Sequence, residues 1–154
     1  MNSKILKNKL LKLVVFPVGS LNVAFTIESV QKVIKSTQVY GSGLSHLGIA
    51  HIEDREITVI DLHKRLFSTS QPIPSEAKTY LILAKNSSGE QFGIIVNQTP
   101  SLVDVPLSSV RVLPESYRRA DTLKIASHVT VVSQETEEKT IFILDTDQLI
   151  AQIV

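Results

Sequence analysis

A chain of 154 residues, 43% of them hydrophobic, is long enough to bury a substantial core as one compact unit without disulfides or a structural metal. Sixteen Lys and Arg against fifteen Asp and Glu leave a net charge of +1, which disfavours binding to nucleic acid or another polyanion. The absence of Cys excludes a disulfide framework and a thiolate metal site, and no apolar run is long enough to cross a bilayer.

The first twelve residues are basic and partly apolar, but Lys7, Asn8 and Lys9 interrupt them before they reach the apolar length of a signal peptide. We therefore expect a soluble, cytoplasmic protein. Its expected organisation is an N-terminal tail at residues 1–12, one domain at residues 13–150 and a short C-terminal end at residues 151–154.

The expected domain opens with a pattern typical of a half-buried β-hairpin. Two strands are predicted, an apolar one at residues 13–18 and one at residues 21–27 in which apolar and polar residues alternate, and a turn that contains Gly19 separates them. The segment that follows, residues 28–35, fits either a short helix or an irregular sheet edge. Its apolar residues are Val30, Val33 and Ile34.

A second hairpin is predicted from residues 47–52, which are apolar apart from His51, and from the β-branched run at residues 57–60, with Gly48 near its start. The residues between the runs are all charged and are expected to form its tip: Glu53, Asp54, Arg55 and Glu56. Asp61 follows the second strand directly, where its carboxylate would accept backbone N–H groups and start a helix at Leu62.

The chain then repeats this plan after a polar, proline-containing connector at residues 68–75. Strands are predicted at residues 79–85 and 91–96, on either side of a turn that contains Gly89. The last segment, residues 125–150, resembles the second hairpin and ends in the same way, with a strand, an Asp and a helix.

Several matches between the halves indicate a duplicated unit. Residues 23–27 match residues 92–96, and Asp61 matches Asp145. A looser match pairs Val30 and Val33 with Leu102 and Val103. The sequence therefore predicts an all-β fold in which a unit of four or five short strands occurs twice and forms two small barrels over one core. Chance similarity between Val-rich and Ile-rich strands is the alternative.

The chain lacks the phosphate-binding loops, the nucleophile elbow and the zinc-binding helix that mark common enzyme classes. The four histidines are spread over predicted loop, strand and helix, which argues against a metal site: His46, His51, His63 and His128. We expect neither a cofactor nor catalysis. Two alternatives stay open, an enzyme with dispersed catalytic groups and a small barrel that binds a ligand or nucleic acid.

The order and spacing of short motifs resemble those of the CheW-like coupling domains of bacterial chemosensory arrays, from about Leu13 to Ile150. The motifs are Val15-Phe16 with Gly19, Val30 with Val33, Gly48-Ile49 leading to Val59-Ile60-Asp61-Leu62, Gly93-Ile94-Ile95-Val96 followed by Val103, Leu113-Pro114, and Ile143-Leu144-Asp145 with Leu149-Ile150. The resemblance implies two pseudo-symmetric five-stranded β-barrels over a shared hydrophobic core, in agreement with the duplication.

The resemblance also implies a non-catalytic adaptor. Such proteins couple the cytoplasmic tip of a chemoreceptor to the regulatory domain of a CheA-type histidine kinase, in chemotaxis, phototaxis or twitching motility, and other CheW-like domains are further partners. It implies no nucleic acid and no direct membrane insertion. The residues assigned to the partner groove are Val30, Val33, Ile34, Ile94, Val96 and Val103. Core packing is the alternative for each of them. Gly19, Gly48, Asp61 and Asp145 are expected to be structural.

This chain departs from the family at the hairpin tip. The family usually has Asn-Leu-Arg-Gly where this chain has His51-Ile52-Glu53-Asp54, so two acids replace a positive charge and a turn glycine. The departure predicts a divergent member whose tip, Glu53 to Glu56, selects its own receptor or kinase by charge. A CheW-like scaffold used for another protein–protein interaction is the alternative.

Overall fold

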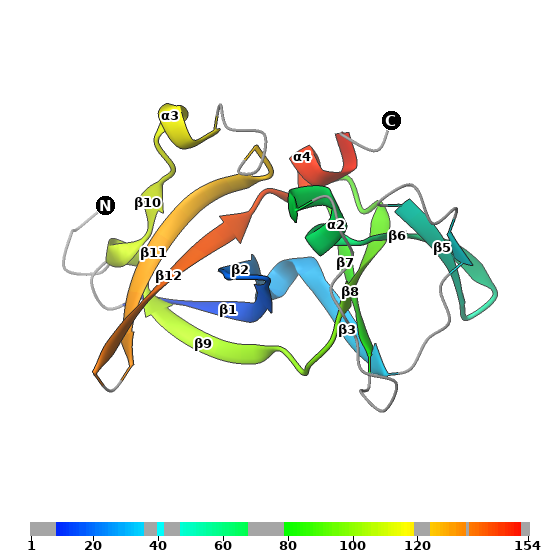
Figure 1. Cartoon of the computed structure of the whole chain (residues 1–154), viewed down its shortest axis with the longest axis horizontal. Coiled ribbons are helices and arrows are strands. Elements are labelled where there is room, and N and C mark those ends of the chain that lie inside the picture. The colour runs from blue at the N-terminus through cyan, green and yellow to red at the C-terminus, as the bar shows by residue number, and fades with distance from the viewer. Residues whose placement is uncertain are drawn as a thin grey trace.

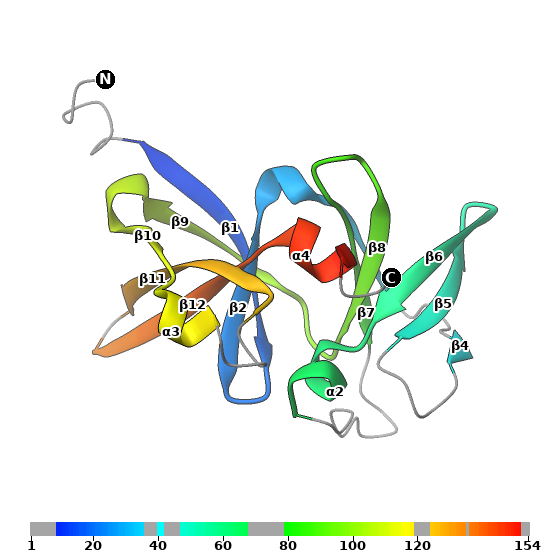
Figure 2. The same ribbon diagram turned by 90° about the horizontal axis from the view of Figure 1, so that it is seen from above.

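A computed structural model of the protein describes residues 9–35, 40–41, 47–67, 79–118, 124–134 and 136–151. The expected tail up to residue 8, the connector at 68–75 and His46 lie outside the described residues. Strands dominate the fold and form two barrel-like halves that lie side by side (Figures 1 and 2).

Each half is built on a sheet of six strands. Sheet A has, in spatial order, β10 (Arg111–Val112), β11 (Ala126–Gln134), β12 (Glu137–Leu144), β2 (Leu21–Thr26), β1 (Leu10–Val18) and β9 (Ser101–Pro106). Sheet B has β4 (Tyr40–Gly41), β5 (Leu47–Ile52), β6 (Arg55–Ile60), β8 (Gln91–Val96), β7 (Tyr80–Lys85) and β3 (Val30–Lys35). The short helices are η1 (Ile27–Ser29), α2 (Leu62–Phe67), η2 (Leu107–Ser109), α3 (Glu115–Arg118) and α4 (Thr146–Ala151).

The two sheets have the same topology, which confirms the expected pseudo-symmetry. Each contains one parallel pair: Ile143 of β12 lies opposite Ala24 of β2, and Val59 of β6 lies opposite Gly93 of β8. The match of residues 23–27 with 92–96 therefore holds in three dimensions. Each sheet has six strands instead of the expected five because a two-residue strand, β4 or β10, pairs at its edge.

Each half contributes one strand to the other half. β3 follows β2 of sheet A along the chain but pairs with β7 at the edge of sheet B, and β9 follows β8 of sheet B but pairs with β1 at the edge of sheet A. Residues 30–35 are thus an edge strand and not a helix, because their backbone is paired with β7. We call β3 and β9 the exchanged strands.

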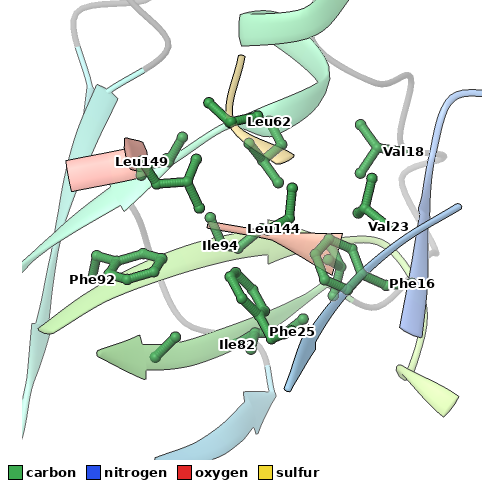
Figure 3. Packing of buried hydrophobic residues seen from close by; sticks show 14 of the residues in the cluster. Phe16, Val18, Val23, Phe25, Leu62, Ile82, Phe92, Ile94, Leu144 and Leu149 are labelled. Carbon is green, nitrogen blue, oxygen red and sulfur yellow. The ribbon is translucent and has the colours of Figure 1, made fainter. Parts of the chain in front are cut away.

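The largest core cluster lies between the two barrels, and both halves contribute to it (Figure 3). Phe25 lies at its centre, with its ring centroid 5.7 Å from that of Phe16 and 5.9 Å from that of Phe92. Truncating such a buried ring to Ala costs about 3–5 kcal/mol. Smaller clusters fill the interior of each barrel around Leu13 and Leu81. The barrels therefore share one core.

Two strands begin two or more residues earlier than expected. β1 begins at Leu10 and not at Leu13, because residues 10–12 pair with the end of β9. β6 begins at Arg55 and not at Ile57, because the hairpin closes in a two-residue turn. A backbone hydrogen-bond partner distant in the sequence explains the first difference, and turn geometry explains the second.

Candidate partner-binding surfaces

The tip of the β5–β6 hairpin is a tight turn formed by Glu53 and Asp54, with φ angles of 49° and 64°. Two consecutive residues with positive φ form the two-residue hairpin turn whose twist matches that of the flanking strands, and Asn-Gly or Asp-Gly is its preferred sequence. Here the second position, which favours glycine, holds Asp54. The other two expected tip residues already belong to β6, where Arg55 lies opposite Ile52 and Glu56 opposite His51.

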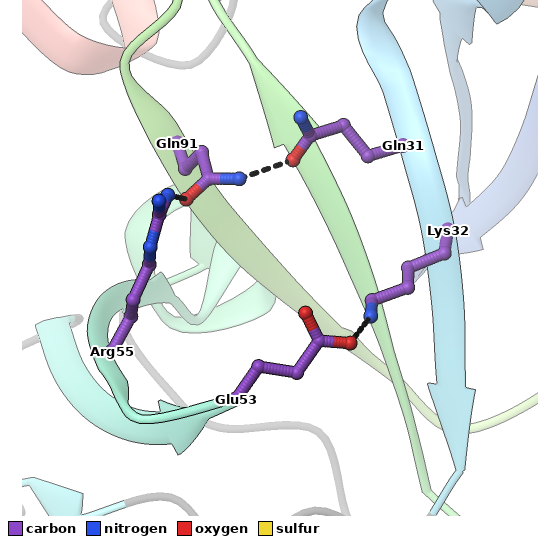
Figure 4. A network of polar contacts seen from close by, with 5 residues as sticks. All are labelled: Gln31, Lys32, Glu53, Arg55 and Gln91. Carbon is purple, nitrogen blue, oxygen red and sulfur yellow. Dashed lines mark hydrogen bonds and ion pairs between the residues drawn. The ribbon is translucent and has the colours of Figure 1, made fainter.

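Side-chain contacts bind this tip to two other strands (Figure 4). Glu53 forms an ion pair with Lys32 of β3. Arg55 donates from Nη1 to Oε1 of Gln91 on β8 at 3.3 Å, and Gln91 donates from Nε2 to Oε1 of Gln31 on β3 at 2.6 Å. Glu53 and Arg55 therefore have side-chain partners within the chain. Asp54 and Glu56 are exposed beside them.

The Lys32 ammonium group controls the electrostatics of the tip. Its hydrogen bond to the Glu53 carboxylate, together with its positive charge, lowers the pKa of Glu53 below the usual range, and Arg55 adds a smaller effect in the same direction. Glu53 is thus held in its charged form by an exposed partner that salt and solvent partly screen.

The exchanged strands carry exposed apolar side chains at equivalent positions. Val33 of β3 lies opposite Ile82 and is 41% exposed, and Leu102 of β9 lies opposite Val14 and is 63% exposed. Val14 and Ile82 are themselves equivalent, because each pairs with a residue of the matching strands β2 and β8. Figure 1 shows β3 and β9 along the lower side of the molecule. We call Val33 and Leu102 the exchanged-strand surface.

The other residues assigned to the groove are less accessible. Ile94 and Val96 have 0% and 3% of their surface exposed, because both faces of β8 are covered and these two side chains pack into the shared core. They do not line a surface. Val30, Ile34 and Val103 are half-buried and pack against the three core clusters. Leu102 was not among the residues assigned to the groove, and its equivalence to Val33 follows only from the strand registers.

The two matching aspartates both begin helices. The Oδ1 atom of Asp61 accepts the backbone N–H of Lys64 at 3.0 Å, and Oδ1 of Asp145 accepts those of Asp147 and Gln148 at 3.1 and 3.2 Å. These hydrogen bonds confirm the expected N-caps of α2 and α4.

Each capped helix contacts a hairpin turn of the other barrel. Phe67 at the end of α2 packs against Gly19, whose φ is 58° and where an added Cβ would lie 2.8 Å from the Phe67 ring. Asp147 of α4 accepts the backbone N–H of Ser87 at 3.1 Å and its Oγ–H at 2.8 Å, in the β7–β8 turn. Figure 2 shows α4 between the barrels. Gly48, the fourth residue with an expected structural role, is half-buried in β5 opposite Val59.

No cluster of three metal-binding side chains occurs within the described ranges. Two of the histidines make local contacts: the ring of His63 lies 5.0 Å from that of Phe67, and Nδ1 of His128 lies 2.7 Å from Oγ of Ser127. Across the same ranges, no helix has both the length and the apolar character needed to span a bilayer.

Two barrels that exchange strands over one core define a double β-barrel domain, and comparison with known proteins identifies its family. The model of the CheW-like domain matches residues 12–154, so the chain belongs to the CheW-like family. Members of this family are non-catalytic scaffold or adaptor proteins of chemotaxis.

A solved structure shares the fold. The crystal structure of the scaffolding protein TtCheW from Thermoanaerobacter tengcongensis superposes with a TM-score of 0.70 and 21% sequence identity, over 89% of this chain and 90% of that chain. At this identity the likeness shows the fold alone. No curated protein sequence matches.

Proposed function

We propose that this chain is a coupling adaptor that joins the cytoplasmic tip of a chemoreceptor-type protein to the regulatory domain of a CheA-type histidine kinase. The observation that carries the proposal is the pair of exposed apolar side chains at equivalent positions of the exchanged strands, Val33 and Leu102, in a chain of the CheW-like family. The adaptor acts in the cytoplasm beside membrane receptors and serves chemotaxis, phototaxis or twitching motility.

Binding on the exchanged-strand surface needs only shape and apolar area. Receptor tips present helices, and a helix binds by placing its apolar side chains in a hydrophobic groove at helical spacing. Val33 and Leu102 supply exposed apolar contacts, and the half-buried Val30, Ile34 and Val103 extend the surface at its edges. A second CheW-like domain, including that of the kinase, is a suitable partner for a barrel end because the two folds are alike.

The hairpin tip is proposed to select among partners. Glu53 and Arg55 are engaged by Lys32 and Gln91, so they hold the tip in place. Asp54 and Glu56 are exposed and present negative charge where the family usually has an arginine nearby. A partner surface with a Lys or Arg at this position fits better than one that evolved to meet an arginine, and charge at a rim changes specificity more than affinity.

The test is binding of the purified protein to a receptor-tip fragment and to the kinase regulatory domain, separately and together, by isothermal titration calorimetry and size-exclusion chromatography. We expect a ternary complex. Val33→Asp and Leu102→Asp are each expected to weaken receptor binding by about tenfold or more, since a charge is then placed in an apolar contact. Val131→Asp is the matched control, because Val131 is 51% exposed but lies on β11.

The outcomes separate the adaptor from a repurposed scaffold. Binding to neither partner would contradict coupling. Receptor binding that survives both charged substitutions would place the contact elsewhere on the protein. Each variant should keep the thermal unfolding midpoint of the parent, because both side chains are already exposed in the folded state.

A further inference from the structure

The β11–β12 hairpin projects past the strands on either side of it (Figure 1). β10 pairs with β11 only at His128 and Val129, and β2 pairs with β12 only at residues 141–143. In the part of the chain that the structure describes, residues 131–133 of β11 therefore have no strand on their outer side. We call these three residues the open edge of β11.

The open edge presents unpaired backbone groups. Leu113 donates its backbone N–H to the carbonyl of Ser127 at 2.9 Å, so Ser127 faces the β10 side of the strand and not β12. Because alternate residues of an antiparallel strand direct their N–H and C=O groups to the same side, those of Val131 and Ser133 face outwards as well. Among the described residues, neither has a backbone partner on that side. Their N–H and C=O groups are therefore available to an added strand.

The outer edge of β12 is less suited to strand addition. Its unpaired part carries three charged side chains, those of Glu137, Glu138 and Lys139, and charge on an edge strand acts against the pairing of a further strand. The open edge of β11 consists of two valines and a serine, so it has no such protection, and β-branched residues favour strand pairing. Strand addition is therefore favoured at β11.

A hollow of about 600 Å³ adjoins the open edge, between β10 and β11. Val131 lines it and is 51% exposed, and the half-buried Val129 and Phe142 line it on the same face of the sheet. Among the described residues that line the hollow, Arg111 alone is charged, and it is exposed. The hollow thus suits an apolar side chain that lies next to an anionic group.

Ser109 and Val110 close one end of the open edge. The Oγ atom of Ser109 lies 3.0 Å from Oγ1 of Thr130, and Val110 leads directly into Arg111. A strand that adds to residues 131–133 therefore has to end or turn away where it reaches Thr130, and a chain terminus meets this condition without a turn. Because the terminus lies near Arg111, a C-terminal carboxylate is attracted there and an N-terminal ammonium group is repelled.

We propose that the open edge of β11 binds the C-terminal segment of a partner protein as an added antiparallel strand. Antiparallel pairing brings the C-terminus of the segment to the Thr130 end of the edge. The backbone of the segment pairs with Val131 and Ser133, the apolar side chain of its last residue packs on Val131 and Phe142, and its carboxylate binds Arg111. Main-chain hydrogen bonds supply the affinity in this mode of binding. The edge is separate from the exchanged strands, so the inference does not depend on the proposed coupling function.

The probes are fluorescein-labelled peptides of about eight residues, long enough for one strand. They share the sequence Thr-Val-Thr-Val and end after it in a free carboxylate, in a carboxamide or in a further Gly-Ser-Gly. Fluorescence anisotropy measures their affinity for the full chain. We expect the carboxylate peptide to bind about tenfold more tightly than the other two, because only it places an ionised group at Arg111.

Substitutions then assign the contacts. Arg111→Glu should remove the preference for the free carboxylate, and Arg111→Lys should keep most of it. Ser133→Pro removes an outward N–H that no strand of the protein uses, and it should weaken binding of all three peptides by about tenfold. Glu138→Pro is the matched control, because Glu138 lies opposite Ser133 and directs its N–H to the other edge of the hairpin. Neither Glu138→Pro nor Val33→Asp should change binding.

Equal binding of the three peptides to the parent protein, or unchanged binding after Ser133→Pro, would overturn the proposal. An equal loss of binding in Ser133→Pro and Glu138→Pro would also overturn it, because the effect would then come from the hairpin as a whole. Thermal unfolding by circular dichroism verifies that each variant is folded. The Arg111 variants change one exposed side chain, so they test the carboxylate contact even if a proline variant does not fold.

Discussion

Lys32 and Glu53 are 21 residues apart in the chain, and their ion pair joins the tip of the β5–β6 hairpin to the exchanged strand β3. Lys32 is the immediate neighbour of Val33, so the hairpin tip and the exposed apolar side chain proposed to contact a partner are mechanically linked. A partner that displaces the tip would also disturb β3, and a change at the tip would alter the surface around Val33.

The first prediction concerns the pH dependence of this contact. The pKa of Glu53 is lower in the folded protein than in the unfolded chain, so its stabilising contribution is complete above the usual glutamate pKa of about 4.3 and is lost as the pH falls through the folded value. The urea midpoint of the parent should therefore exceed that of Glu53→Gln at pH 7 and approach it in acid. The effect is small and salt-sensitive because the pair is exposed.

Glu56→Gln is the matched control for this measurement, since Glu56 is also exposed and belongs to the same hairpin. A difference between the parent and Glu53→Gln that grows as the pH falls would contradict the sign of the pKa shift. The same comparison in about 1 M salt should reduce the difference at neutral pH.

Replacement of Asp54 by glycine should stabilise the protein. Its φ of 64° lies in the left-handed region that glycine adopts without a steric penalty, and the expected gain in the free energy of unfolding is about 0.5–1 kcal/mol. Asp54→Ala should lower the stability, because alanine has neither the freedom of glycine nor a side chain that tolerates this conformation. Chemical denaturation of both variants measures the difference, and a destabilised Asp54→Gly would show that the carboxylate contributes more than the backbone.

Partner choice should follow the exposed charges of the tip and not the engaged ones. Asp54→Lys and Glu56→Lys should lower the affinity for the chain's own receptor or kinase partner by about five- to tenfold and reduce the discrimination against partners with an acidic surface. Competition binding with both partner types is the appropriate measurement. Glu53→Gln should leave the ranking of partners unchanged, and a reversal of that ranking would move the specificity to Glu53.

Gly19 should be intolerant of alanine for two separate reasons. Its φ of 58° costs an L residue about 1–2 kcal/mol, and the new Cβ would meet the Phe67 ring at 2.8 Å. Gly89→Ala is the matched control, because Gly89 has a φ of 83° and a Cβ added there would meet no atom within 4 Å, so this variant reports the backbone cost alone. Gly19→Ala should lower the free energy of unfolding more than Gly89→Ala does. In a double variant, Phe67→Ala should remove this additional loss, because the ring that the new Cβ would meet is gone. Equal costs in the first comparison would mean that the ring moves aside freely.

The two helix caps should have similar energetic values. Asp61→Ala and Asp145→Ala should each lower the free energy of unfolding by about 1 kcal/mol, because each removes an acceptor of backbone N–H groups at the first turn of a helix. Asp61→Asn and Asp145→Asn should retain most of the stability, since asparagine is an equally good cap. Thermal and urea denaturation of the four variants test this pair of expectations, and a larger loss in the asparagine variants than in the alanine variants would contradict them.

Some of these features could be predicted because they depend on neighbours in the chain. Alternation in residues 21–27, the turn at Gly19 and the capping carboxylates at Asp61 and Asp145 involve contacts within a few residues, and short-range geometry fixes which groups meet. The repeat that relates Asp61 to Asp145 also predicted the two barrels, because a sequence pattern that occurs twice indicates a structural unit that occurs twice.

The candidate surfaces were predicted less well. The sequence shows that Ile94 and Val33 are apolar, but it does not show whether another strand or helix covers their side chains. Ile94 lies on an inner strand of sheet B and is buried in the core cluster that both barrels share, whereas Val33 lies on an edge strand. For this reason, the family resemblance assigned both residues to the partner groove.

By itself, the sequence determined the family, the two-fold repeat, the capped helices and the charged hairpin tip. Only the tertiary structure decided that β3 and β9 change barrels, that Ile94 and Val96 are core residues, that Leu102 is exposed as Val33 is, and that Lys32 neutralises Glu53. The physical reason is that burial and ion pairing depend on segments distant in the sequence, and the local periodicity of a strand carries no information about which segment lies across from it.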